Sequence, residues 1–450
     1  MVTDRHAHAM TYTDADAVRH YEKALDSLLF FRGEVSAEAG AVLDASPRSA
    51  MGNVFHAYLG LLGTEETDAA GAATAFEAYR RDVPVADLTP RERMHVEAAS
   101  SWLDGDMHRA GRVLAELVVA HPKDALALAV GHQIDFFTGD ATLLRDRIGG
   151  ALSAWDQDDP HYGLLQGMYA FGLEEAGHYT QAEHVGLQAV ERNARDVWGI
   201  HAVVHAYEMQ GRHEDGIRYL DARADDWSTG NYLNVHNWWH YALYVLETGR
   251  TEKVLAVYDA AVHHDDSGGA AMELLDAASL LWRLYLVGAD TGNRWPVLAE
   301  AWDRRHDGAY YAFNDIHAVM AYVGAERIAD AERLIRDREA WLRDAGPGLS
   351  NVPMTAEIGL PVSRALVAYG QRRYADAVDL LLPLRRRLHT FGGSHAQRDA
   401  LQKTLVEAAL HARRHDLART LLSERISLRP RCPYDQKAWA RLVQRTSAFA

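Results

Sequence analysis

The sequence predicts an all-α fold built from a repeated pair of antiparallel helices. One helix–turn–helix unit occupies residues 95–124, HVEAASSWLDGDMHRAGRVLAELVVAHPKD, with Gly105 at its turn and Pro122 near its end. The same pattern recurs from Tyr169, YAFGLEEAGHYTQAEHVGLQAVERNARD, with Gly177 at the turn. Alternating β-branched stretches bounded by turns are essentially missing, so we expect no sheet. Together these observations predict an α-solenoid of the tetratricopeptide-repeat type, in which each helix pair stacks on its neighbours.

Turns of this kind can be followed along the chain. Three of the eight gaps between them are 34 residues, the period of tetratricopeptide repeats, and longer gaps indicate longer loops or helices. The predicted turn positions are Gly105, Gly139, Gly177, Gly211, Gly249, Gly292, Glu326, Arg372 and Arg413. The position five residues after the turn is small in most units: Ala110, Ala182, Gly216, Ala331, Ala377 and Ala418. It is larger in three degenerate units, at Leu144, Val254 and Val297.

The domain organisation follows from these units. Residues 12–85 predict further helix pairs, with a turn near Gly63. We expect an N-terminal extension over 1–20, repeats with a histidine-rich groove over 21–265, and repeats over 266–450 that continue the same superhelix. No linker rich in proline or serine divides the array, and the loop at 262–276, VHHDDSGGAAMELLD, is the predicted break. The superhelix is expected to be strongly curved or closed.

Composition excludes several classes of protein. Apolar residues make up 48% and charged residues 24% of the 450 residues, as in folded soluble proteins. The net charge of -16 argues against non-specific nucleic-acid binding, which requires neutralising phosphates. No signal peptide and no apolar run of about 18 residues is visible, so we expect a cytoplasmic protein without a membrane partner. The single cysteine, Cys432, fits a reducing compartment. The nearby Arg429 and Arg431 favour a lowered thiol pKa, but we expect a loop thiol at this place to be incidental.

The 24 histidines are the most unusual count, and they point to a candidate site. In HAVVHAYEMQGRHEDG, His201, His205 and Glu208 are spaced four and three apart and therefore share one helical stripe. The first helix of each pair generally lines the concave surface of such arrays, so this stripe is expected to face the groove. The next unit, NVHNWWHYALYVLETG, repeats the theme with His236 and His240.

The first hypothesis for this stripe is a metal site. Two histidines at i and i+4 reach one divalent cation, and a carboxylate completes three protein ligands with an open position for water. We expect His201, His205, His236 and His240 to bind zinc, iron or manganese, with Glu208 as a ligand or base. The sequence contains no H-E-x-x-H motif, so the pairs carry the prediction alone.

The second hypothesis uses the histidines without a metal. His205 would act as the general base, Glu208 would orient it, and His240 would stabilise developing negative charge. Large aromatic side chains beside histidine suit a small polar or aromatic molecule. The residues expected to line such a ligand pocket are His95, His132, Trp239, Tyr244, Glu247 and His317.

A purely structural role is the alternative for each histidine. Buried histidines are commonly hydrogen-bonded to a backbone carbonyl or a neighbouring carboxylate. On this interpretation Asp135 anchors His132 and Asp315 anchors His317.

Three functions remain open. The preferred one is a small-molecule pocket that catalyses hydrolysis, hydration or elimination. The second is an adaptor that binds a partner protein or peptide in the concave groove. The third is a self-assembling subunit, in which aromatic outer helices bury the face of a homodimer.

The chain also resembles the tetratricopeptide repeat protein 38 family from about residue 20 to 440. The segments that carry the resemblance are, in order, RERMHVEAASSWLDGD, GHQIDFFTGD, HAVVHAYEMQGR, HNWWHYALYVLETG, NDIHAVMAYVGA and RPRCPYDQKAW. The resemblance implies an all-α superhelix in a soluble, intracellular protein. It implies no reaction and assigns no catalytic residue.

Overall fold

The computed structural model describes residues 2–264, 267–305 and 308–447, and it confirms the all-α fold. Within these ranges the only strands are β1 (Val2–Thr3) and β2 (Ala9–Met10), which pair antiparallel. The sequence prediction of no sheet misses this hairpin, because two residues are too few to show an alternating pattern. No helix in these ranges is long and apolar enough to cross a bilayer.

The chain divides into two compact units. The first contains Met1–Val203, Asp226–Asn234 and Gly346–Asn351, and the second contains Val204–Asp225, Val235–Ala345 and Val352–Ala450. The loop at 262–276, predicted as the break, lies inside the second unit, and its residues 265 and 266 are outside the described ranges.

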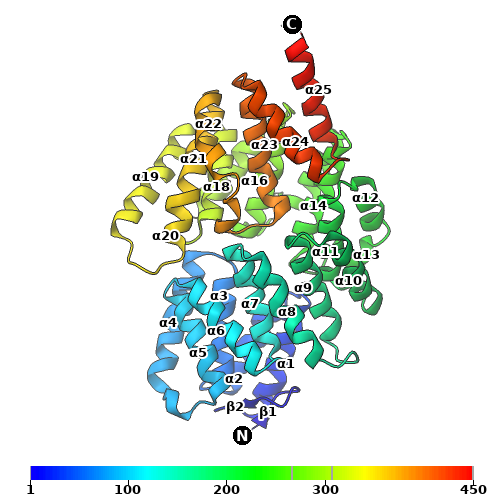
Figure 1. Ribbon diagram of the computed structural model, residues 1–450. Coiled ribbons are helices and arrows are strands. Elements are labelled where there is room, and N and C mark those ends of the chain that lie inside the picture. The colour runs from blue at the N-terminus through cyan, green and yellow to red at the C-terminus, as the bar shows by residue number, and fades with distance from the viewer. Residues whose placement is uncertain (1, 265–266, 306–307, 448–450) are drawn as a thin grey trace. The chain divides into compact units, whose positions relative to one another are not determined.

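The helices of the first unit are shown in blue to green in Figure 1. They are α1 (Ala15–Leu29), α2 (Val35–Ala45), α3 (Ala50–Leu62), α4 (Glu66–Asp82), α5 (Pro90–Leu103), α6 (Met107–Ala120), α7 (Ala125–Thr138), α8 (Ala141–Ala151), α9 (Tyr162–Glu175) and α10 (Tyr179–Arg192). Short 3₁₀ turns lie between these helices at Val85–Asp87 and Leu152–Ala154. Helices that are consecutive in the chain, such as α5 and α6 or α9 and α10, pack against each other as pairs (Figure 1).

Four helices contain points where the chain passes between the units: α11 (Val197–Met209), α13 (Ala224–Trp227), α14 (Asn234–Glu247), which enters the second unit after its first residue, and α20 (Asn351–Pro353). The helices of the second unit are α12 (His213–Asp221), α14 (Asn234–Glu247), α15 (Thr251–Val257), α16 (Ala271–Leu286), α17 (Arg294–Arg305), α18 (Ala312–Gly324), α19 (Ile328–Asp344), α21 (Leu360–Gly370), α22 (Tyr374–Leu381), α23 (His395–His411), α24 (His415–Leu428) and α25 (Pro433–Ser447). Two π-helical segments occur at Tyr258–Val262 and Met354–Gly359, and 3₁₀ turns at Leu382–Leu384 and Leu388–Phe391.

All nine predicted turn positions adopt a left-handed backbone. Eight of them end a helix, where this conformation satisfies the last carbonyls. Gly292 does not: α16 ends at Leu286, and Gly288 (φ 74°) is the left-handed residue that follows it. The six glycines have φ between 57° and 85°. Glu326, Arg372 and Arg413 adopt the same conformation with φ of 60°, 61° and 58°, although a side chain makes it less favourable. The turn predicted near Gly63 is centred one residue later, at Thr64 (φ 58°).

The small residues after these turns are packed as the repeat requires. Ala110, Ala182 and Ala331 are fully buried. At Gly216 a Cβ atom would lie 2.3 Å from the ring of Tyr244, so only glycine allows α12 to approach α14 this closely. This packing confirms the tetratricopeptide-repeat-like solenoid as the architecture of the chain.

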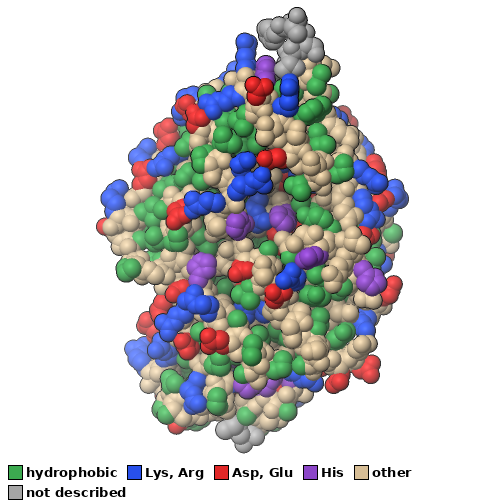
Figure 2. Space-filling model, in the orientation of Figure 1, with side chains coloured by type: hydrophobic (Ala, Val, Ile, Leu, Met, Phe, Trp, Pro, Cys, Tyr) green, Lys and Arg blue, Asp and Glu red, His purple; other side chains and the backbone are tan. Residues whose placement is uncertain are grey.

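Several first helices of the pairs are buried on nearly all sides rather than on one stripe. In α16, 13 of its 16 residues are buried, and in α7, 11 of 14. Helices that are apolar on all faces belong to the interior. The positions predicted to line an open groove, including His201, His205 and Glu208, are likewise buried. Charged side chains of both signs are instead interspersed over the outer surface, as the face in Figure 2 shows.

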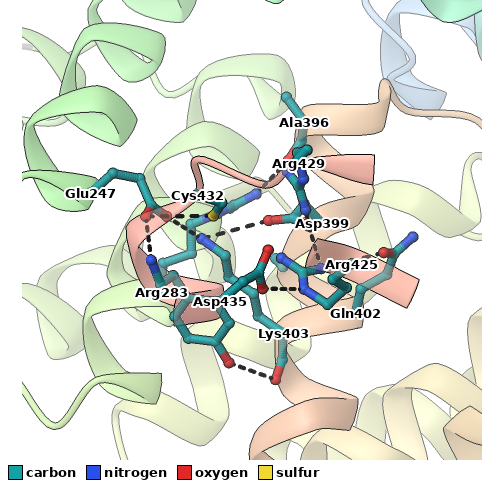
Figure 3. A network of polar contacts seen from close by, with 12 residues as sticks. Glu247, Arg283, Ala396, Asp399, Gln402, Lys403, Arg425, Arg429, Cys432 and Asp435 are labelled. Carbon is teal, nitrogen blue, oxygen red and sulfur yellow. Dashed lines mark hydrogen bonds and ion pairs between the residues drawn. The ribbon is translucent and has the colours of Figure 1, made fainter. Parts of the chain in front are cut away.

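A network of buried charges links α14, α23 and the C-terminal helices of the second unit (Figure 3). Lys403 Nζ lies 2.6 Å from a carboxylate oxygen of Glu247 and 3.5 Å from Asp399. Asp399 also accepts hydrogen bonds from Arg425 at 2.7 Å and Arg429 at 2.5 Å. Burial disfavours each charge, but the opposite charges outweigh it: they hold the pKa of Glu247 at about 2 and raise the pKa of Lys403.

Cys432 lies in this network, and the arginines near it in the sequence do not lower its pKa. The thiol is buried beside the Glu247 carboxylate, 3.7 Å away. Burial and this carboxylate raise the pKa of Cys432 far above its ordinary value, despite the nearby Lys403 and Arg429. A buried thiol of this kind is unreactive.

The start of α11 contains a second group with a shifted pKa. Asp196 Oδ1 accepts a hydrogen bond from the backbone N–H of Gly199 at 2.9 Å, which caps the helix. Its other oxygen has no hydrogen-bond partner among the described residues. Burial raises the pKa of Asp196 to about 7, although the backbone N–H groups of Gly199 and Trp198 lower it.

We predict that Glu247→Gln lowers the free energy of unfolding by about 3–5 kcal/mol at pH 7, because it leaves Lys403 buried without its closest counter-charge. Urea denaturation measures this loss. Glu247→Gln/Lys403→Met removes both charges and should recover most of the stability. Since the folded pKa of about 2 lies below the ordinary 4.5, the parent should lose this contribution as the pH falls from 4.5 towards 2. Equal stability of the single and double variants would contradict the pairing.

We predict that Asp196→Asn stabilises the protein by about 1–3 kcal/mol at pH 8 and has little effect at pH 4. The asparagine oxygen retains the cap to Gly199, and the variant avoids ionising a buried carboxyl. Because the folded pKa of about 7 lies above the ordinary 3.8, the parent is most stable below pH 4 in this respect and loses that stability as the pH rises through 7. Thermal unfolding across this pH range tests the sign. A uniform destabilisation at both pH values would contradict it.

Candidate metal centre

Helix α11 presents the first histidine pair. The segment VWGIHAVVHAYEM is apolar on nearly every face, and its left-handed end at Gly211 allows α12 to fold back. His201 and His205 lie one turn apart on this helix, and each offers a ring nitrogen within 4.8 Å of the other. The division between the units passes through α11 between these two histidines, after Val203.

Helix α14 presents the second pair inside the second unit. His236 and His240 are one turn apart, and the Tyr244 hydroxyl one turn further donates a hydrogen bond to the Val204 carbonyl at 2.5 Å. That bond fixes α14 against the part of α11 that carries His205. The predicted ligand-pocket residue Tyr244 is therefore a clamp between the two helices.

His205, His236 and His240 converge within the second unit, and we call these three the histidine cluster. One ring nitrogen from each lies within 4.8 Å of the others. The ring centroids are 4.4 Å apart for His205 and His240 and 4.8 Å apart for His236 and His240. His205 and His240 are fully buried, whereas the side chain of His236 is 17% exposed.

A buried carboxylate orients one member of the histidine cluster. Asp276 on α16 is 1% exposed, and its Oδ2 lies 2.7 Å from His236 Nδ1. A hydrogen bond at Nδ1 leaves Nε2 as the ligand atom of the ring. The sequence analysis missed Asp276. Its only signal is an acidic residue in the otherwise apolar stretch ELLDAASLLW.

Trp239 covers the histidine cluster on one side. Its ring stacks on His236 at 5.1 Å and meets His240 edge-on at 4.7 Å. The guanidinium carbon of Arg283 lies 5.3 Å from the Trp239 ring, and this arginine donates hydrogen bonds to the Ser279 and Ala396 carbonyls. Trp239 thus separates the imidazoles from a buried cation.

The two predicted glutamates lie elsewhere in the second unit. Glu208 Oε2 is 3.8 Å from His213 Nε2 at the start of α12, and Glu208 is not in the group of potential ligands. Glu247 belongs to the charge network around Lys403. Both glutamates lie on the same helical stripes as the histidines. Their partners come from neighbouring helices, and the spacing along one helix does not predict these partners.

The other three predicted ligand-pocket histidines have separate surroundings. In the first unit, His95 contacts Asp124 at 2.9 Å, and His132 Nε2 lies 3.1 Å from the Met168 carbonyl. In the second unit, His317 Nδ1 lies 2.7 Å from the Phe313 carbonyl. Burial lowers the pKa of His132 to about 3 and that of His317 to about 4. Both rings are neutral packing elements with a backbone partner.

The predicted carboxylate anchors of these histidines are wrong. Asp135 forms two hydrogen bonds with Arg147, at 2.7 and 2.8 Å, and Asp315 pairs with Arg338 at 2.7 and 2.9 Å. A guanidinium binds a carboxylate through two charge-assisted bonds, which a neutral imidazole cannot match.

No family model matches the chain. Among solved structures, it is similar to a human IFIT1 dimer with PPP-AAAA, at 11% identity and a TM-score of 0.43, covering 96% of this chain and 95% of that one. It is also similar to the APC/C hetero-tetramer Cut9-Hcn1, at 12% identity and a TM-score of 0.40, covering 95% of this chain and 83% of that one. At these identities and TM-scores the similarity carries no argument about function.

Proposed function

We propose that this chain binds a divalent transition-metal ion through the histidine cluster of His205, His236 and His240. The observation that carries the proposal is the convergence of three imidazole nitrogens within 4.8 Å of one another, from α11 and α14, in the interior of a unit. Three histidines are a sufficient set for a metal site that keeps a further position open.

The surroundings of the cluster support a metal. Metal-ligating histidines commonly donate their second N–H to a carboxylate, as His236 can do to Asp276.

The kind of ligand atom limits which metals would bind. Imidazole ligands suit zinc, iron, copper and nickel, whereas manganese and magnesium favour oxygen. Of the metals expected from the sequence, we therefore propose zinc or iron ahead of manganese. His236 is the member of the cluster with measurable exposure, so water or a small substrate would reach the ion from its side. A metal-bound water at that position would serve hydrolysis, hydration or elimination.

The second candidate is a scaffold that binds a partner protein or peptide. Stacked helix pairs form extended surfaces, and this architecture is what favours the scaffold. On this view the histidine cluster only packs helices. Protein that carries no metal and has the same stability with and without chelator would leave the scaffold as the better interpretation.

We predict that protein purified without a histidine tag contains zinc or iron, measured by elemental analysis. His240→Ala should contain about one equivalent per chain less than the parent, because it removes a central ligand of the histidine cluster. His184→Ala is the matched control, since His184 is exposed on α10 and should leave the content unchanged. Equal metal content in His240→Ala and the parent would refute the site.

We predict that Asp276→Asn weakens metal affinity by about 10–100-fold without abolishing binding, because it weakens the bond that orients His236. Competition with a chromophoric chelator measures the change. Glu273→Gln changes another carboxylate on the same helix and should bind like the parent. Parent-like affinity in Asp276→Asn would show that the carboxylate does not support a ligand.

A further inference from the structure

The first unit brings a different set of potential ligands together at its N-terminal hairpin. His6 lies in the turn between β1 and β2, while Asp159 and His161 belong to the loop that leads into α9. One ligand atom from each of these three residues lies within 4.8 Å of the others. His6 is more than 150 residues away from Asp159 and His161 in the sequence, so no local motif predicts the whole group.

Both imidazoles are buried and incompletely satisfied. His161 is fully buried; its Nε2 lies 2.7 Å from Asp26 Oδ1, and its Nδ1 has no hydrogen-bond partner among the described residues. The His6 side chain is 6% exposed; its Nδ1 lies 3.7 Å from Asp159 Oδ2, and its Nε2 also has no partner in the described ranges. Two buried ring nitrogens without partners at one place require an explanation, and an ion is one.

The backbone on both sides holds these residues in place. Asp4 Oδ1 accepts hydrogen bonds from the backbone N–H of His6 at 3.0 Å and of His8 at 2.9 Å, which shapes the hairpin turn. Asp159 Oδ1 accepts one from the backbone N–H of His161 at 2.9 Å, so its other oxygen remains available. The Trp155 ring meets His6 edge-on at 4.8 Å.

Asp26 on α1 gives His161 the same kind of support that Asp276 gives His236. The Asp26 carboxylate contacts Nε2 of His161, and Nδ1 of the same ring stays available to bind an ion. Arg5 in turn donates two hydrogen bonds to Asp26, at 2.9 and 3.1 Å, which keeps that carboxylate ionised and oriented.

We propose that His6, Asp159 and His161 form a second binding site for a divalent first-row transition metal. Two imidazoles and one carboxylate are a set that binds iron(II), zinc or cobalt(II) and leaves positions open for water. The Asp159 side chain is 15% exposed, so solvent reaches this site directly. The inference is independent of the histidine cluster, since all its residues lie in the first unit.

The competing explanation is an ion pair between protonated His6 and Asp159, with no metal. It predicts that substitutions here change stability and leave metal binding untouched. Metal binding to the full chain therefore separates the two.

The test is a cobalt(II) titration of the full chain in a His240→Ala background, which removes the histidine cluster, monitored by visible absorption and elemental analysis. We expect one equivalent to remain in His240→Ala, to be lost in His6→Ala/His240→Ala, and to bind about 10-fold or more weakly in Asp159→Asn/His240→Ala. Asparagine keeps the acceptor for the His161 N–H, so this variant retains the loop. His8→Ala/His240→Ala is the matched control from the same hairpin and should bind like His240→Ala.

The possible outcomes distinguish the two sites. Equal cobalt binding with and without His6, or binding only at millimolar cobalt, overturns this inference. A folded His240→Ala that binds no cobalt, with one equivalent in the parent, also overturns it and supports the histidine cluster. One equivalent that survives His240→Ala and disappears with His6→Ala supports this site and refutes the cluster. Circular dichroism of each variant confirms that the helices are intact.

Discussion

On several first helices of the pairs, such as α7, α16 and α23, side chains have almost no access to water, and this constraint governs the chemistry of the interior. A polar group placed there must find its partner inside the protein, because burying an unpaired charge or hydrogen-bonding group is costly. The interior nevertheless holds many such groups, among them Arg91, Asp124, Arg147 and Lys403. Most are paired with opposite charges from neighbouring helices, as Arg91 is with Asp124 and Arg147 with Asp135.

Helix α14 carries both a buried ion pair and a group of potential metal ligands. At its C-terminal end Glu247 forms an ion pair with Lys403, which balances its charge inside the protein. Two turns earlier, His236 and His240 meet His205, and Asp276 orients His236. Three imidazole nitrogens within 4.8 Å of one another match the ligand set of a metal site with an open position, and this is why we prefer a metal to a packing role.

The sequence predicted features within one helix pair well. The left-handed turns at Glu326 and Arg372 and the small Ala110 and Gly216 are local requirements, and they recur at a regular spacing in the sequence. The i, i+4 histidine pairs were predictable for the same reason. Partners on other helices were not, because contacts between pairs depend on how the helices slide and rotate against each other. Asp276 was therefore missed, and Asp135 was assigned to a histidine although Arg147 binds it more strongly.

Each of the two proposed sites buries most of its ligands and leaves one in contact with solvent. At the histidine cluster His205 and His240 are fully buried, and the side chain of His236 is 17% exposed. At the second site His161 is fully buried, and the side chain of Asp159 is 15% exposed. An ion at either site would bind the folded state and add stability by mass action. It would also keep a position that water or a small substrate reaches past the exposed ligand, which metal-assisted chemistry requires.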